Sequence, residues 1–107
     1  MKILLDECVT KKLKSYLAHY EIYTVTNMKW NGLKNGKLLN EAVKEEFDLL
    51  LTIDKNIAYQ QNVAEYNLII CVLDSKSSKI EDIIKLLDIF NNQLEGFAKR
   101  NYYLISG

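Results

Sequence analysis

The chain has 107 residues, which is the size of one compact domain with one hydrophobic core. Its 14 basic and 14 acidic side chains give a net charge of zero, which excludes the strong overall positive charge of many nucleic-acid-binding proteins. No apolar run approaches the roughly 20 residues that cross a bilayer, and no secretory signal is recognisable. Two cysteines are typical of a reduced compartment. We therefore expect a single domain over residues 1–107, cytoplasmic and without membrane association.

The charges are unevenly distributed along the chain. Residues 1–40 carry seven lysines against three acidic residues, whereas residues 41–107 carry seven basic against eleven acidic residues. Lys11, Lys12 and Lys14 lie in one short stretch. This clustering is typical of a solvated helix face, and it also fits a weak phosphate-binding rim.

In the first half of the chain, short apolar runs alternate with helical patterns, which predicts a parallel sheet with crossover helices. Residues 3–5 are apolar at successive positions, as in a strand that is covered on both faces. Residues 9–18 have apolar side chains at helical spacing, and residues 22–25 fit a second strand. Residues 27–36 have the composition of a loop.

In the second half, the next helix has an apolar face that includes Leu38 and Ala42, and residues 49–53 form the strongest buried strand. A short helix or turn at residues 56–61 precedes another buried strand at residues 68–73. The last helix carries apolar side chains on one face from Ile80 to Leu94, with Ser78 as its expected N-cap. A closing strand at residues 102–105 would lie at an edge of the sheet, which leaves homodimer formation open.

Three of these predicted strands end in aspartate, at Asp6, Asp54 and Asp74. Ligands of a parallel sheet bind at the carboxyl ends of the strands, where the strand order reverses. If the first strand is central, with the second on one side and the third on the other, Asp6 and Asp54 are neighbours there. A divalent cation would relieve their repulsion, and oxygen ligands alone favour Mg²⁺ or Mn²⁺, which can support phosphodiester cleavage. Each aspartate would instead cap its following helix if it has only a structural role.

Three segments of the chain resemble the short PIN-like proteins, relatives of VapC-type toxin nucleases: KILLDEC, WNGLKNGKLL and LLLTIDKNIAYQQN. The similarity runs from Lys2 to about Leu73 and depends on a strand ending in Asp-Glu together with a later Thr-x-Asp-Lys-Asn. It implies an α/β fold, a PIN-like three-layer α/β/α sandwich with a mainly parallel sheet of four to five strands. It also implies a Mg²⁺- or Mn²⁺-dependent ribonuclease with RNA as substrate, and the toxin of a toxin–antitoxin pair with a cognate antitoxin as partner.

The resemblance also assigns residues to this site. Asp6 and Asp54 match metal-binding acids, and Glu7 matches a further polar position. Asn35, in the expected loop, stands where relatives often carry aspartate, and Glu41, one helical turn further on, would supply the missing carboxylate. The expected catalytic residues are therefore Asp6, Glu7 and Asp54, with Asp6, Asp54, Asn35 and Glu41 as metal ligands. The expected substrate contacts are Lys11, Lys12, Lys14, Lys55, Asn56, Gln60 and Gln61.

Two other interpretations fit parts of the same pattern. Asp6-Glu7 and Asp54 also resemble a phosphoacceptor receiver domain, in which an acidic pair holds Mg²⁺ beside an aspartate that accepts phosphate. The chain lacks the lysine that this pattern needs at the end of a fifth strand. The second alternative is a catalytically weakened PIN-like interaction module, because Asn35 replaces an acid. Neighbouring carboxylates are expected to raise the pKa of Cys8, which argues against a nucleophilic thiol.

Overall fold

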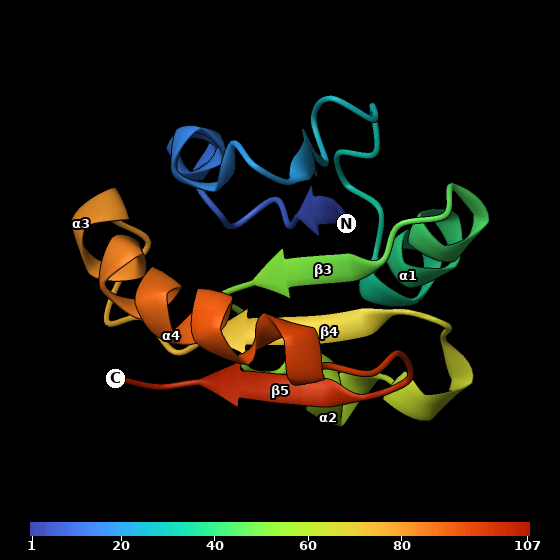
Figure 1. The fold of residues 1–107 in the computed structure, drawn as a ribbon. Coiled ribbons are helices and arrows are strands. Elements are labelled where there is room, and N and C mark those ends of the chain that lie inside the picture. Colours follow the sequence, from blue (N-terminus) through green and yellow to red (C-terminus); the bar gives the residue numbers. More distant parts are fainter.

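In the computed structural model, five strands form one sheet that carries helices on both faces (Figure 1). The structure describes the backbone of residues 1–107 and every side chain except that of Ala58. The strands are β1 (Lys2–Leu5), β2 (Glu21–Thr24), β3 (Leu49–Thr52), β4 (Ile69–Leu73) and β5 (Tyr102–Ile105). The α-helices are α1 (Asn35–Lys44), α2 (Ile57–Gln60), α3 (Ile80–Ile83) and α4 (Leu87–Gln93). The 3₁₀ segments are η1 (Lys11–Leu17), η2 (Val63–Glu65), η3 (Ile84–Leu86) and η4 (Leu94–Gly96).

The strand order is β2-β1-β3-β4-β5, and every neighbouring pair is parallel. The sheet therefore confirms the expected α/β class, with β5 as the closing edge strand. β1 lies between β2 and β3, as the argument from the aspartates requires. The chain thus changes its direction across the sheet at the boundary between β1 and β3, and all strand arrowheads point to one edge (Figure 1).

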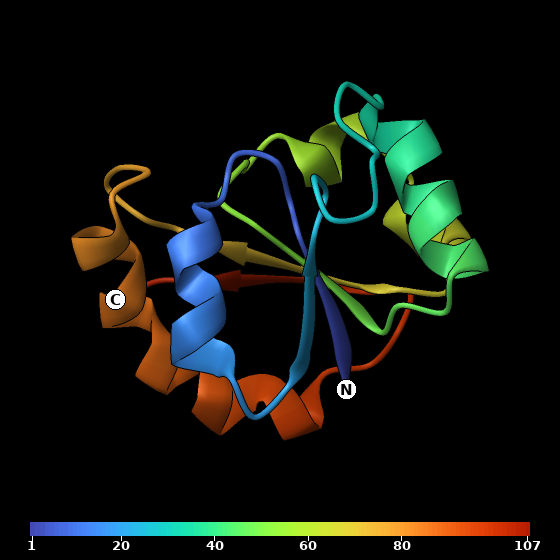
Figure 2. The same ribbon diagram turned by 90° about the horizontal axis from the view of Figure 1, so that it is seen from above.

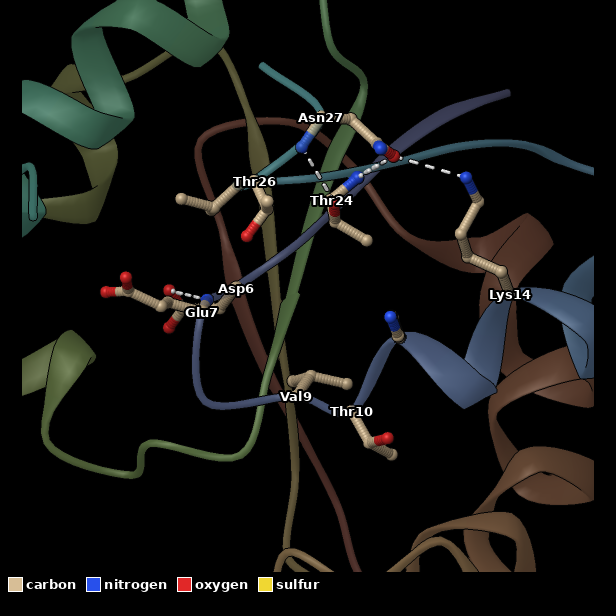
Figure 3. A pocket seen from close by; sticks show the side chains of 10 residues that line it. Asp6, Glu7, Val9, Thr10, Lys14, Thr24, Thr26 and Asn27 are labelled. Carbon is tan, nitrogen blue, oxygen red and sulfur yellow. Dashed lines mark hydrogen bonds between the residues drawn. The ribbon is translucent and has the colours of Figure 1, made fainter. Parts of the chain in front are cut away.

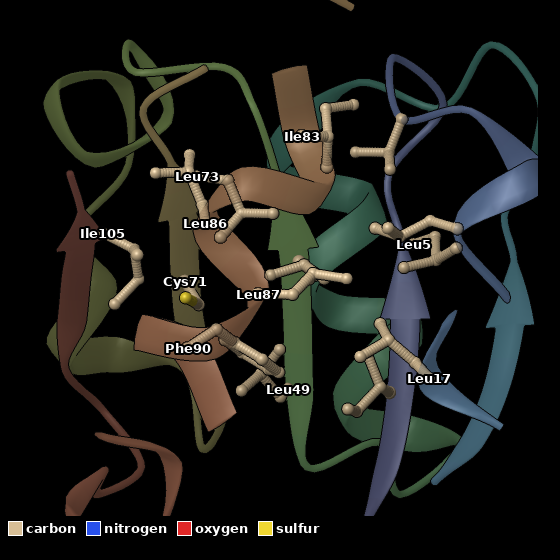
Figure 4. Packing of buried hydrophobic residues seen from close by; sticks show 14 of the residues in the cluster. Leu5, Leu17, Leu49, Cys71, Leu73, Ile83, Leu86, Leu87, Phe90 and Ile105 are labelled. Atoms are coloured by element: carbon tan, nitrogen blue, oxygen red, sulfur yellow. The ribbon is translucent and has the colours of Figure 1, made fainter. Parts of the chain in front are cut away.

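Both faces of the sheet are buried, which explains why the strands are apolar at successive positions. On one face, Leu4 and Leu50 pack with α1 and α2. On the other face, Leu5 and Leu51 belong to the core that also contains Phe90 and the helices η1, α3 and α4 (Figure 4). The view from above shows these two helical layers on opposite sides of the sheet (Figure 2). Each fully buried side chain of this size contributes about 1.5–3 kcal/mol to folding.

The connection from β4 to β5 has a hand opposite to that of the other three. The connections β2–β3, β3–β4 and β4–β5 all run in the same direction along the strand order. The helices of the first two connections, α1 and α2, pack on one face of the sheet. The helices α3 and α4 instead pack on the face that η1 covers (Figure 1). About 98% of such connections are right-handed, so β4–β5 is an exception to a strong rule. The face that these helices leave open keeps Leu104 45% exposed.

Two helical segments differ from their expected form. The segment expected at residues 9–18 is a 3₁₀ helix, η1, whose N-cap Thr10 accepts a hydrogen bond from the Lys12 amide. The last helix is divided into α3, η3, α4 and η4. The prediction of Ser78 as its N-cap is wrong, because the cap is Lys79 and no side chain bonds it as a cap. Ser77 holds this turn instead, accepting from the Lys79 amide at 3.1 Å and donating to Asp82 at 2.6 Å.

Among the described residues, no helix is both long enough and apolar enough to span a membrane.

Candidate active site

The carboxyl ends of β1 and β3 bring Asp6 and Asp54 to one place at the edge of the sheet. The Asp6 amide donates a hydrogen bond to the Leu51 carbonyl oxygen at 3.0 Å, so the residue after β1 is still attached to β3. Asp54 follows the end of β3 by two residues. The change in strand direction between β1 and β3 is the position at which open α/β sheets bind ligands.

Thr52 links the two aspartates. Its hydroxyl group donates to Asp6 Oδ2 at 2.7 Å and accepts from the Asp54 amide at 3.0 Å. Thr52 is fully buried, and it is the one polar residue in the buried core among the side chains described. A buried hydroxyl group is costly unless it is hydrogen-bonded, so this geometry is well determined. In the sequence, Thr52 belongs to the Thr-x-Asp pattern without a predicted role of its own; the signal for that role is a threonine that ends an apolar strand.

Each aspartate also stabilises its own turn. Asp6 Oδ1 accepts from the Glu7 amide at 2.8 Å, and Asp54 Oδ1 accepts from the Asn56 amide at 2.9 Å. These contacts show that both carboxylates have a structural role at the start of a turn. They do not neutralise the negative charges, because all of these donors are uncharged. Among the side chains that the structure describes, neither Asp6 nor Asp54 forms an ion pair.

Cys8 lies beside the same hydroxyl group. Its sulfur is 3.4 Å from Thr52 Oγ1 and 3.6 Å from Asp6 Oδ2. Burial of the thiol is the main cause that raises the pKa of Cys8, and the negative charge of Asp6 adds to the rise. The expected direction of the shift is confirmed, with desolvation rather than the carboxylate as its largest cause. A protonated thiol is a poor nucleophile, so Cys8 does not act as one at neutral pH.

Glu7 points toward the loop between β2 and α1. Asn31 Nδ2 donates to Glu7 Oε1 at 3.1 Å and to Thr26 Oγ1 at 3.0 Å. Asn31 thus fixes the carboxylate of Glu7 against this loop, a contact that sequence analysis did not anticipate. The two residues are 24 positions apart, and only the fold brings them together.

The two remaining expected metal ligands lie on α1 in different surroundings. Asn35 Nδ2 donates to Gln60 Oε1 at 3.1 Å and so joins α1 to α2. Glu41 forms an exposed ion pair with Lys44 at 3.5 Å and lines a cavity of about 460 Å³ with Trp30. The cavity beside Asp6 has a different lining, in which Glu41 has no part.

The expected substrate contacts on α2 form a second polar group. Gln61 Oε1 accepts a hydrogen bond from the Tyr66 hydroxyl group at 3.4 Å. A Cβ atom on Gly36 would lie 3.3 Å from the same oxygen, so the glycine permits close packing of α1 on this group. Asn56, which precedes α2, and Gln60 are exposed. Of these residues, Gln60 contacts Asn35, and Asn56 contacts Asp54 through its amide.

The expected lysine contacts are divided among three places. Lys11 and Lys14 line a cavity of about 530 Å³ with Asp6 (Figure 3). Lys12 lines a different hollow, together with Thr10 and Ser78 at the start of the last helical layer.

Lys55 forms an ion pair with Asp74, with 2.6 Å between its Nζ atom and Asp74 Oδ1. Its hydrogen bond to Asp74 raises the pKa of Lys55 and lowers the pKa of Asp74. The structure therefore directs Lys55 to the carboxylate that follows β4.

Asp6 and Asp54 are the two residues at the β1–β3 boundary whose oxygen atoms could hold a Mg²⁺ or Mn²⁺ ion. Within the described part of the chain, no group of three or more acidic, histidine or cysteine side chains could hold a metal. Mg²⁺ needs fewer protein ligands than that, because it keeps several waters and is often bound by one or two carboxylates together with substrate phosphates. Asp6 and Asp54 supply such a pair of hard ligands without charge neutralisation by the protein.

No family model, curated protein or solved structure matches this chain. The resemblance to PIN-like proteins is therefore carried by the quoted residues alone.

Proposed function

We propose that this protein is a Mg²⁺- or Mn²⁺-dependent ribonuclease of PIN-like type. The observation that carries the proposal is the link through Thr52, which fixes Asp6 and the turn of Asp54 at the β1–β3 boundary without neutralising either carboxylate. Two carboxylates without an ion-pair partner lie here at the boundary between β1 and β3, where open parallel sheets bind ligands. The three segments that resemble PIN-like proteins support the choice of RNA as substrate.

In this mechanism Asp6 and Asp54 would hold the divalent ion, and the chemistry that such an ion supplies is activation of a water molecule and stabilisation of the leaving oxygen. Thr52 is a positioning residue, because its hydroxyl group fixes the direction of Asp6 Oδ2. Glu7, held by Asn31, orients water molecules at the outer side of the site. The acids repel a phosphodiester in the absence of the ion, so substrate and ion strengthen each other's binding.

Asn35 is hydrogen-bonded to Gln60, and Glu41 is paired with Lys44, so neither side chain contacts the two aspartates in this structure. We therefore place both outside the minimal site. Lys11 and Lys14 remain the substrate contacts nearest to the acids.

The test is cleavage of a labelled single-stranded RNA by the purified protein in Mg²⁺ or Mn²⁺, with EDTA as control. We expect metal-dependent cleavage that Asp54→Asn abolishes while the variant keeps its melting temperature. Cleavage that persists in EDTA, or that survives this substitution unchanged, would show that the acids do not hold a catalytic ion. Co-purification with the product of a neighbouring gene tests the antitoxin assignment, and sedimentation tests the homodimer.

The strand order favours one second candidate, a receiver-like phosphoacceptor. Doubly wound sheets of order 2-1-3-4-5 include the receiver type. Two observations oppose it: the β4–β5 connection has the opposite hand, and β5 is followed by Ser106 and Gly107 rather than a lysine. A small-molecule phosphodonor would modify Asp54 in this case, and the RNA would remain intact.

The third interpretation is a catalytically weakened PIN-like interaction module. It is supported by Asn35, which stands where relatives often carry an acidic residue. It predicts no change in melting temperature when Mg²⁺ or Mn²⁺ is added. A ligand that binds only the folded state raises the melting temperature, so a metal titration separates this candidate from both metal-dependent ones.

A further inference from the structure

A cavity of about 530 Å³ lies beside the acids, between the start of η1 and the loop that follows β2 (Figure 3). This volume is within the usual range for small-molecule sites, about 300–1,000 Å³. Its walls come from chain segments near residues 6–14 and 24–27, which β1 and β2 bring together. The cavity thus opens from the carboxylates toward the β2 edge, away from α2.

The two ends of this cavity carry opposite charges. Asp6 and Glu7 supply the negative charges of the lining, and Lys11 and Lys14 supply its positive charges. In Figure 3 the carboxylates point away from Lys14, which lies across the cavity. An anionic group therefore binds most favourably beside the lysines and away from the acids.

Lys14 is held in place by the loop after β2. Its Nζ atom donates to Asn27 Oδ1 at 3.2 Å, and the same oxygen accepts from the Thr24 amide at 3.0 Å. The Asn27 amide in turn donates to Thr24 Oγ1 at 2.9 Å. An ammonium group has three donors, so Lys14 keeps donors for a ligand while its position is fixed by the protein. Such preorganisation reduces the entropy lost on binding.

Between these ends the lining is partly apolar. Val9 and Val25 line the cavity, and because they are only 6% and 2% exposed, each presents a small apolar surface to it. Thr26 adds a hydroxyl group, which already accepts from Asn31 and keeps its own proton for donation. A cationic end, an apolar wall and a hydroxyl donor match the phosphate, the flat face and the polar edge of a nucleotide.

We infer that this cavity binds one nucleotide of single-stranded RNA, next to the phosphodiester that the acids cleave. Lys11 and Lys14 bind its phosphate, and the base or ribose lies against Val9 and Val25. The strand must be single, because a base that is stacked and paired in a duplex is not free to lie against the wall of the cavity. This inference rests on the proposed function for the position of cleavage, whereas binding itself needs neither metal nor cleavage.

The test measures binding in EDTA, where no cleavage occurs. Fluorescence anisotropy with a labelled five-nucleotide RNA gives the affinity of the full chain and of Lys14→Gln, and a second variant, Lys11→Gln, checks the same end of the cavity. The matched control is Lys99→Gln, which removes a positive charge from the loop before β5. Lys99 pairs with Asp48 at 3.4 Å, at the opposite edge of the sheet.

We expect saturable binding that Lys14→Gln weakens about fivefold or more. The slope of log binding constant against log salt concentration should become less steep by about 0.7 for each phosphate contact that is lost. Lys99→Gln is expected to bind like the unmodified protein, and duplex RNA of the same sequence more weakly. Equal affinity of Lys14→Gln and Lys99→Gln would overturn the inference. Binding of adenosine 5′-monophosphate as tightly as the oligonucleotide would overturn the assignment to a strand and indicate a free nucleotide as the ligand.

The result separates this inference from the proposed function. RNA cleavage by the purified protein together with unchanged binding of Lys14→Gln overturns the inference alone. Saturable, Lys14-dependent binding without cleavage in Mg²⁺ or Mn²⁺ overturns the ribonuclease proposal and supports the cavity as a nucleotide-binding site.

Discussion

The β1 side and the β4 side of the sheet's carboxyl edge have the same sequence pattern, but the aspartate is paired with a cation on only one of them. Asp6 and Asp74 each follow a buried strand. Asp74 forms an ion pair with Lys55 at 2.6 Å and accepts from Ser106 at 3.4 Å, whereas Asp6 accepts from the uncharged Thr52 hydroxyl group and the Glu7 amide. An aspartate at a strand end is therefore not itself a sign of a site. The partner that the neighbouring segments supply decides whether its charge remains available.

The largest expected difference between the two sides is in activity. Asp6→Asn should reduce RNA cleavage by about two orders of magnitude or more, because the amide is a weaker ligand for the ion. Asp74→Asn should leave the rate within about twofold, since this carboxylate is already neutralised. Initial rates at saturating Mg²⁺ measure both. Equal losses in the two variants would remove the functional distinction between the two sides of the edge.

The next effect concerns Thr52, which orients Asp6. Thr52→Val keeps the shape of the side chain but leaves the Asp54 amide without its partner, so we expect a loss of about 1–3 kcal/mol in the free energy of unfolding. Activity should fall about tenfold or more, as it does when residues behind a metal ligand are removed. Thr52→Ser is the control, because it retains the hydroxyl group and should recover most of the activity. A valine variant with normal activity would show that Thr52 only stabilises the fold.

The two cysteines, one on each side, should differ in their reactivity toward a thiol reagent. Burial raises the pKa of Cys71, in β4, to about 12, and raises the pKa of Cys8 as well. Because Cys8 is at the exposed edge and Cys71 is fully buried, a thiol reagent should modify Cys8 in the folded protein and Cys71 only after unfolding. The rate at Cys8 should increase as the pH rises, since the thiolate is the reactive form. Fast modification of two thiols under native conditions would contradict this prediction.

The smallest expected effect is on the pH dependence of stability. Lys55 lowers the pKa of Asp74 below its usual value of 3.8, so folding favours the carboxylate. The pair therefore stabilises the protein above that pH, and this contribution is lost as the pH falls through the lowered pKa. Urea unfolding should show Asp74→Asn slightly less stable than the unmodified protein near pH 7, with the difference vanishing in acid. The effect is small, because the pair is exposed to solvent.

A double variant checks that the effect belongs to the pair. Asp74→Asn combined with Lys55→Gln should be no less stable than either single variant, because each change removes the same interaction. Additive losses would show that Lys55 and Asp74 act separately.

Much of the fold and part of the site could be predicted from the sequence. The apolar runs located all five strands within about one residue, and the Asp residues after them indicated which edge would carry polar groups. The prediction of Ser78 as the N-cap of the final helix was wrong. Ser77 and Ser78 are equivalent in sequence, and only the contact with Asp82 shows that Ser77 holds this turn. The hand of the β4–β5 connection was also not predictable, since it depends on which face the apolar side of α3 and α4 covers.

The sequence by itself determined that Asp6 and Asp54 end buried strands, because burial on both faces leaves a continuous apolar run whose end is visible without any structure. Only the tertiary structure decided that Lys55 neutralises Asp74, that Asn31 holds Glu7, and that Lys14 faces the acids across a cavity. The first two contacts join residues that lie in different connections of the sheet, and the third joins residues of the connection between β1 and β2. Their partners are chosen by strand order and by the direction of each loop, which local periodicity does not encode.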